Sequence, residues 1–206
     1  MSRDASARLA DAVRGLIETM AECESPPSSL DAATDSVIAV NDVLRSGSSA
    51  RPRSRNVPST DAEPWPYFHL SPISGVANPL APPMRVEVRD QTVFATCVFN
   101  LAYQGPPGYV HGAFVAAVFD ELLGIANAVT GNPAMTGRLE IRYLRPTPIG
   151  VRLELTGRHT GRSGRRVLAS GTIAHNGVVT AEAEGVFVEI SPARSAELFP
   201  HHVRGA

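Results

Sequence analysis

The strongest constraint on the fold is a helical segment, residues 111–129, whose apolar side chains point in every direction around the helix axis. Those side chains are Phe114, Val115, Ala116, Ala117, Val118, Phe119, Leu122, Leu123, Ile125 and Ala126. A helix that is apolar on all sides is buried on all sides. This segment therefore needs a surface that surrounds it, and a single curled sheet would supply one.

Segments with the alternation typical of β-strands lie on both sides of this helix. They are residues 85–89, 92–99, 138–145, 151–159, 165–175 and 178–190. In the last of them the alternation shifts at Gly185, which indicates a bulge. Two strands, one helix and four further strands predict an α+β fold, in which one antiparallel sheet wraps around the long buried helix.

The front of the chain differs in composition, because residues 1–83 hold 10 of the 17 prolines but only 3 of the 17 glycines. Helical spacing of apolar residues predicts helices over 4–22 and about 30–45, the second opening after Ser28-Ser29 as caps. We therefore expect an N-terminal helical extension and linker over 1–65, docked on a main domain over 66–206 or covering its pocket.

Charge and composition exclude several functions. The 19 basic and 20 acidic residues leave a net charge of -1, so we expect no nucleic-acid or membrane partner. All basic residues are Arg, which excludes a Schiff-base lysine and the lysine of a phosphate-binding loop. The longest apolar run, Ala113 to Phe119, is too short to cross a bilayer.

Cys23 and Cys97 make neither a disulfide framework nor a zinc site, and neither His-Glu-x-x-His nor Cys-x-x-Cys occurs. We expect no metal and no cofactor. The residues from Met1 to Asp4 do not begin the apolar core of a secretory signal, so we expect a cytoplasmic protein with reduced thiols.

Two acids, Asp120 and Glu121, interrupt the apolar helix. Burying an unpaired carboxylate is costly, so each requires an explanation. Consecutive helical residues point about 100° apart, so the two cannot face one site. We expect Glu121 to reach an edge and pair with an arginine such as Arg138 or Arg142. Asp120 then remains the candidate for chemistry.

The start of the same helix, Val110-His111-Gly112-Ala113, follows a loop rich in Gly and Pro. Free backbone N–H groups at a helix N-terminus bind negative oxygens, and Gly112 would let a ligand approach the backbone. The alternative is that Gly112 only permits the sharp turn. His111 suits a capping role better than that of a general base.

Residues 108–121, Gly-Tyr-Val-His-Gly-Ala-Phe-Val-Ala-Ala-Val-Phe-Asp-Glu, resemble the His-Gly-Gly…Asp segment of hotdog-fold acyl-CoA thioesterases. The similarity is to the phenylacetate-pathway (PaaI-like) branch of the 4-hydroxybenzoyl-CoA thioesterase superfamily. Leu139 to Pro146 resembles the strand of that family that ends in Tyr-x-Arg-Pro, and the likeness extends over about 84–190. Ala113 replaces the second glycine of the motif, which keeps the amide and adds a methyl group that could narrow the acyl entrance.

The resemblance implies hydrolysis of an acyl-CoA, or of an acyl carrier protein thioester, to free acid and thiol. It implies that the Gly112 amide polarises the carbonyl and that Asp120 acts as general base or nucleophile. Thr136 would assist the water; a hydroxyl that caps its own strand is the alternative. A non-catalytic acyl-CoA-binding protein, a sensor or partner module, is the other functional class, but a binder has no need of a carboxylate at Asp120.

Substrate binding is expected near His111 and Ala113 and at a predicted hairpin, residues 157–166. Its arginines Arg158, Arg162 and Arg165 would suit the phosphates of coenzyme A, and a solvated basic hairpin is the alternative.

The spacing of Gly112 and Asp120 also predicts an oligomer. Eight helical residues rise about 12 Å, whereas one thioester carbonyl must lie about 3 Å from both its donor and the attacking group. Both groups of one chain cannot serve one carbonyl. A twofold homodimer, or a tetramer built from it, would bring Gly112 of one copy to Asp120 of the other.

Overall fold

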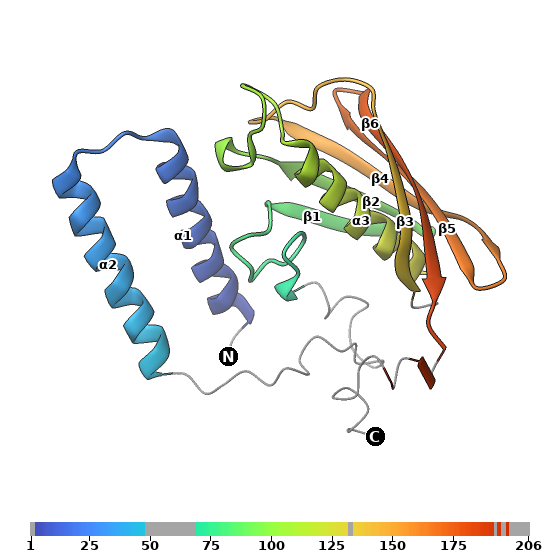
Figure 1. The fold of residues 1–206 in the computed structure, drawn as a ribbon, viewed down its shortest axis with the longest axis horizontal. Coiled ribbons are helices and arrows are strands. Elements are labelled where there is room, and N and C mark those ends of the chain that lie inside the picture. Colours follow the sequence, from blue (N-terminus) through green and yellow to red (C-terminus); the bar gives the residue numbers. More distant parts are fainter. Residues whose placement is uncertain (1–2, 48–68, 132–133, 192, 195–196, 198–206) are drawn as a thin grey trace.

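The computed structural model describes residues 3–47, 69–131, 134–191, 193–194 and 197. Six antiparallel strands form one sheet in the order β1-β2-β4-β5-β6-β3. The strands are β1 (Met84–Arg89), β2 (Thr92–Val98), β3 (Ala134–Tyr143), β4 (Arg152–Ser163), β5 (Arg166–His175) and β6 (Val178–Glu189). Between β2 and β3 come a short 3-10 helix, η3 (Leu101–Tyr103), and the long helix α3 (Gly112–Ala128). The sheet curls around α3, as Figure 1 shows, so the predicted α+β hotdog fold is confirmed.

The core lies between the inner face of the sheet and α3. Phe119, Leu122 and Leu123 of the helix are fully buried. Gly157 of β4 lets the helix lie close to the sheet, because a Cβ there would stand 2.8 Å from Leu122 Cγ. The burial of α3 is incomplete, however, and Asp120 is exposed. The prediction of a helix buried on all sides is therefore wrong for one face within a single chain.

Several strand limits differ from the prediction. Strand β3 begins at Ala134, and β4 continues to Ser163. The bulge predicted at Gly185 lies instead at Thr180, because Ala181 pairs with Ile173 whereas Val179 pairs with Ala174. Gly185 stays in register opposite Ala169. A bulge is placed by how two strands pair, so the alternation of one strand did not locate it.

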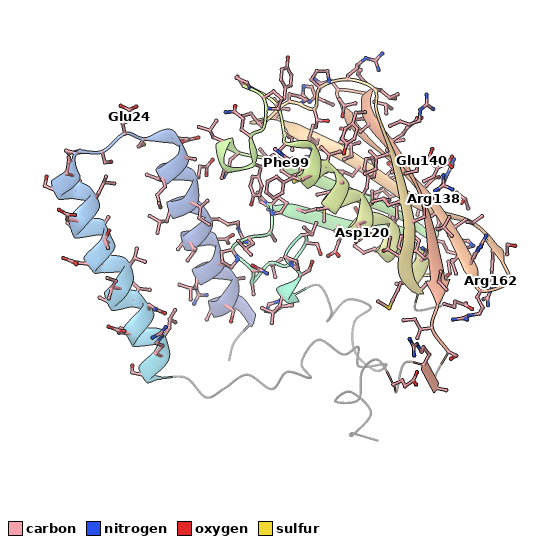
Figure 2. All side chains as sticks on the ribbon, in the orientation of Figure 1. Glu24, Phe99, Asp120, Arg138, Glu140 and Arg162 are labelled. Carbon is pink, nitrogen blue, oxygen red and sulfur yellow. The ribbon has the colours of Figure 1, made fainter. Side chains whose placement is uncertain are left out.

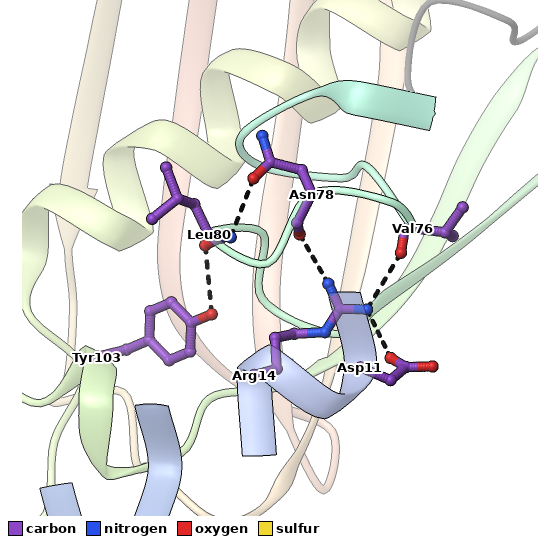
Figure 3. A network of polar contacts seen from close by, with 6 residues as sticks. All are labelled: Asp11, Arg14, Val76, Asn78, Leu80 and Tyr103. Atoms are coloured by element: carbon purple, nitrogen blue, oxygen red, sulfur yellow. Dashed lines mark hydrogen bonds and ion pairs between the residues drawn. The ribbon is translucent and has the colours of Figure 1, made fainter. Parts of the chain in front are cut away.

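Helix α1 (Arg3–Glu22) docks on the segment that precedes β1. Ala10 is buried, and the Arg14 guanidinium donates to the backbone oxygens of Asn78, at 2.7 Å, and Val76, at 3.2 Å. Figure 3 shows these bonds beside the one from the Tyr103 hydroxyl to the Leu80 oxygen. The predicted docking of the extension is thus confirmed for its first helix.

Helix α2 (Pro27–Ser46) has no buried residue, so the expectation that both helices dock is wrong for this one. It begins earlier than predicted, with Pro26 at the N-cap and no side-chain cap. Ser28 and Ser29 lie inside its first turn and do not cap it, because proline already presets the backbone at a helix start. The predicted boundary between residues 65 and 66 lies outside the described residues.

Candidate functional site

The acid singled out in the sequence lies beside the predicted hydroxyl. Asp120 is on the exposed face of α3, and the Thr136 hydroxyl of β3 donates to its Oδ1 at 2.7 Å. The hydroxyl therefore bonds to the helix rather than to its own strand. Figure 2 shows Asp120 on the side of α3 that its own sheet leaves uncovered. A carboxylate oriented by one hydrogen bond and open to solvent can take a proton from water or attack a carbonyl.

The start of α3 has the predicted cap. His111 is the N-cap residue, and its Nδ1 accepts from the Ala113 amide at 3.1 Å, so the capping role is confirmed. The amides of Phe114 and Val115 bond to the His111 oxygen. Within the described part of the chain, the Gly112 amide has no acceptor. It is therefore available to a ligand oxygen at the positive end of the helix dipole.

The loop before α3 is held from three sides. The His111 amide donates to the Tyr103 oxygen at 2.9 Å, and the Val110 amide donates to the Thr147 oxygen at 2.8 Å. The Tyr143 hydroxyl donates to the Gly112 oxygen at 2.9 Å. Tyr143 was known from the sequence only as part of a strand motif. Its contact joins segments that are 31 residues apart, so strand periodicity carried no sign of it.

Glu121 does not meet an arginine, contrary to the prediction. It accepts hydrogen bonds from the hydroxyls of Ser71, at 2.5 Å, and Ser74. Arg138 pairs with Glu140 and Arg142 pairs with Glu182, both on the sheet. Helix α3 turns Glu121 toward the segment before β1, while both arginines lie on β3, at the opposite edge of the sheet from β1. Glu121 therefore ties residues 71–74 to the helix that carries Asp120.

The three arginines expected to bind phosphate do not form one cluster. Arg158 lies within β4 on the sheet face opposite α3, in a groove with Glu140 and Glu184. Arg162 and Arg165, near the β4–β5 turn, both bond to Glu189 of β6. Strand β4 runs to Ser163, so the turn is shorter than the predicted hairpin loop and leaves Arg158 outside it. Figure 2 shows Arg162 at the far end of this hairpin from the start of α3.

Among the residues that the structure describes, the other titratable groups form no second centre. Cys23 is exposed and Cys97 is buried, both as free thiols, and burial raises the pKa of Cys97 to about 12. Burial likewise raises the pKa of Tyr103. Among the described residues, no group of three His, Cys, Asp or Glu side chains could hold a metal ion. None of the helices in the described ranges is long and apolar enough to cross a membrane.

A curled sheet around one helix, with an acid on the helix and a free amide at its start, defines a hotdog protein of the thioesterase type. Residues 107–181 match the family model described as the thioesterase superfamily. The crystal structure of a thioesterase superfamily protein is 32% identical, with a TM-score of 0.77, and the match covers 89% of this chain and 94% of that one. This chain belongs to the thioesterase superfamily.

More distant relatives agree with this family. The acyl-coenzyme A thioesterase THEM4 of Mus musculus is 30% identical over 112 residues, 53% of this chain and 47% of that protein. The chain therefore spans less than half the length of that relative. A hypothetical thioesterase from Streptococcus pneumoniae, crystallised with coenzyme A, has the same fold at 18% identity and a TM-score of 0.50, covering 52% of this chain and 89% of that one.

Proposed function

We propose that the protein hydrolyses the thioester bond of an acyl-CoA. The observation that carries this proposal is the hydrogen bond from Thr136 to Asp120, on an exposed carboxylate in an otherwise apolar helix. The THEM4 relatives, which are named as acyl-coenzyme A thioesterases, support it. A protein that only binds acyl-CoA would gain nothing from an oriented carboxylate at this position.

In the proposed reaction, water attacks the thioester carbon while Asp120 takes one of its protons. The carbonyl oxygen becomes negative and accepts the hydrogen bond of the Gly112 amide. The C–S bond then breaks, the proton passes from Asp120 to the sulfur, and free acid and thiol leave. Thr136 keeps one carboxylate oxygen occupied and so directs the other toward the water. Direct attack by Asp120 is the variant in which the carboxylate is the nucleophile.

We infer that the Gly112 amide and the Asp120 carboxylate of one active site come from different copies of the chain. Gly112 and Asp120 are about 12 Å apart along one helix. If two α3 helices lie antiparallel about a twofold axis, Gly112 meets Asp120 of the second copy only when the axis passes near Ala116. The side chains on this face are small there: Ala113, Ala117 and Gly124 share a helix face with Asp120. Small side chains let two helices pack closely.

Strand β3 supports the same arrangement. It is an edge strand of the sheet and has ten residues, most of them exposed. Long exposed edges readily pair with another chain. Because β3 also carries Thr136, pairing through this edge would bring the Asp120–Thr136 pair to the interface, where a homodimer would have two equivalent sites.

The test is a panel of acyl-CoA substrates assayed for release of free thiol, including phenylacetyl-CoA, medium-chain acyl-CoA and acyl carrier protein thioesters. Phenylacetyl-CoA would test the proposed membership of the phenylacetate-pathway branch. Asp120→Asn should lower turnover by roughly 10²–10⁴-fold. Thr136→Val should lower it as well, with Thr136→Ser restoring it. Glu87→Gln, which changes an exposed acid of β1 at the opposite edge of the sheet, is the control. Full activity of a folded Asp120→Asn protein would refute the assignment.

The shared site is tested by mixing two inactive chains. Asp120→Asn removes the acid, and Gly112→Val brings a branched side chain against Tyr143, whose ring lies 3.6 Å from a Cβ placed at Gly112. Each variant alone should be inactive. Co-expressed with different tags in equal amounts, half of the dimers are mixed and regain one of two sites, so activity should return to roughly a quarter of wild type. Verified mixed dimers without activity would contradict a site shared between copies.

A further inference from the structure

Helix α2 carries an apolar stripe that the described part of its own chain leaves open. At 100° per residue, Leu30, Ala33, Val37, Val40 and Leu44 lie within an arc of about 80°. Leu30, Val37, Val40 and Leu44 are 47–52% exposed. Their spacing alternates between three and four residues, which is the a/d pattern of helices that pair with helices. We call these five residues the α2 stripe.

The way the extension is attached keeps the α2 stripe away from its own domain. The bonds of Arg14 and the burial of Ala10 fix α1 against the segment before β1. Only residues 23–26 separate α1 from α2, and α2 has no buried residue. Figure 1 shows α2 on the outer side of α1, with α1 between it and the sheet. A short connection to a fixed helix leaves α2 no route back to the core, so no described segment of its own chain covers the stripe.

We propose that a second copy of the chain covers the α2 stripe, and that two α1–α2 hairpins pack together as a four-helix bundle. Helix α1 adds three apolar residues with 38–72% of their area free, namely Leu9, Leu16 and Met20. With the four large residues of the α2 stripe, they offer about 350 Å² of free apolar surface at about 100 Å² per side chain. Apolar atoms make up about 60% of an interface, so a pair of hairpins would bury roughly 1,200 Å² in total. That is the lower limit for a stable complex.

Charge favours this occupant over an anionic membrane. Asp31, Asp35 and Asp42 lie together on the side of α2 away from the stripe, and Arg45 is the one basic residue of the helix. Helices that lie on anionic membranes carry basic polar faces instead. The 32%-identical crystal structure covers 89% of this chain, which is more than the hotdog domain alone, so an extension belongs to that relative too.

The hairpin interface differs from the one proposed for the thioesterase site. Strand β3 lies on the other side of α3 from α2 in Figure 1. The two interfaces can therefore form together, and the hairpins would join two site-forming dimers into a tetramer with closed symmetry. The bundle forms whether or not the chain hydrolyses thioesters.

The test compares the masses of full-length chains by light scattering. Val37→Gln with Val40→Gln makes the α2 stripe polar while keeping good helix formers. Asp35→Gln with Ala39→Gln changes the opposite face and is the control. The stripe variant should have half the mass of wild type, with the same thioester hydrolysis per chain, and the control should have the wild-type mass.

Equal masses of wild type, stripe variant and control would overturn the proposal, provided that circular dichroism shows equal helix content. A second outcome is that wild type binds lipid vesicles, the stripe variant does not, and the two have equal masses. This outcome would assign the α2 stripe to a membrane and would also overturn the proposed bundle. A stripe variant of half mass that has lost its helix content is replaced by Val37→Arg with Val40→Arg, because arginine is polar and is also a good helix former. Equal mass of that helical protein and wild type would also refute the bundle.

Discussion

Replacing Glu121 by Gln should loosen the segment before β1 and lower stability. The Glu121 carboxylate accepts hydrogen bonds from the hydroxyls of Ser71 and Ser74, and Ser74 is only 8% exposed. A hydrogen bond to a charged group contributes about 1.5–3 kcal/mol, against about 0.5–1.5 for a neutral one. The two bonds together would lose about 2–3 kcal/mol if fully buried. Because Glu121 is half-buried, solvent screening reduces this to about 1–2 kcal/mol.

Such a loss should lower the melting temperature by roughly 2–8 °C in a domain of this size. Amide hydrogen exchange should rise for residues 71–75 and stay unchanged in β4 and β5. Glu140→Gln, in an exposed pair with Arg138, is the matched control and should shift neither measurement. A double-mutant cycle of Glu121→Gln with Ser74→Ala isolates the contact. A coupling below about 0.5 kcal/mol would show that the hydroxyl contributes nothing, and would refute this reasoning.

Three further results are expected. A thiol reagent at neutral pH should modify Cys23 alone in the native protein and Cys97 only after unfolding, because burial raises the pKa of Cys97 to about 12 and keeps the thiol protonated. Reaction of two thiols per chain in the native state would contradict this. Gly157→Ala should cost about 1–3 kcal/mol in urea unfolding, since its Cβ would stand 2.8 Å from Leu122 Cγ, and an unchanged midpoint would show that α3 can move. Arg14→Met should speed amide hydrogen exchange along α1 but not in the sheet. Exchange rates in α1 equal to those of wild type would mean that apolar packing alone holds that helix.

Periodicity predicted most of the main domain because it is a local property of the chain. The all-round apolar pattern predicted α3 and its enclosure by a sheet, and alternation predicted all six strands. The gap between the predicted strands 85–89 and 92–99 leaves Asp90 and Gln91 for the turn, and both have the positive φ that tight hairpin turns require. The cap at His111 and the acid at Asp120 could also be read from residues close together along the helix.

The partners of particular side chains could not be predicted in this way. Glu121 was expected to meet an arginine of β3, but its partner Ser71 is 50 residues away on a segment without regular periodicity. The bulge at Thr180 depends on how β6 pairs with β5, and the attachment of α1 depends on backbone oxygens 62 and 64 residues from Arg14. The sequence by itself determined which segments are helix or strand and that one helix is enclosed, because apolar spacing along a segment decides those. Only the tertiary structure decided which polar groups meet and which helix faces stay open, because those depend on distances between segments far apart in the chain.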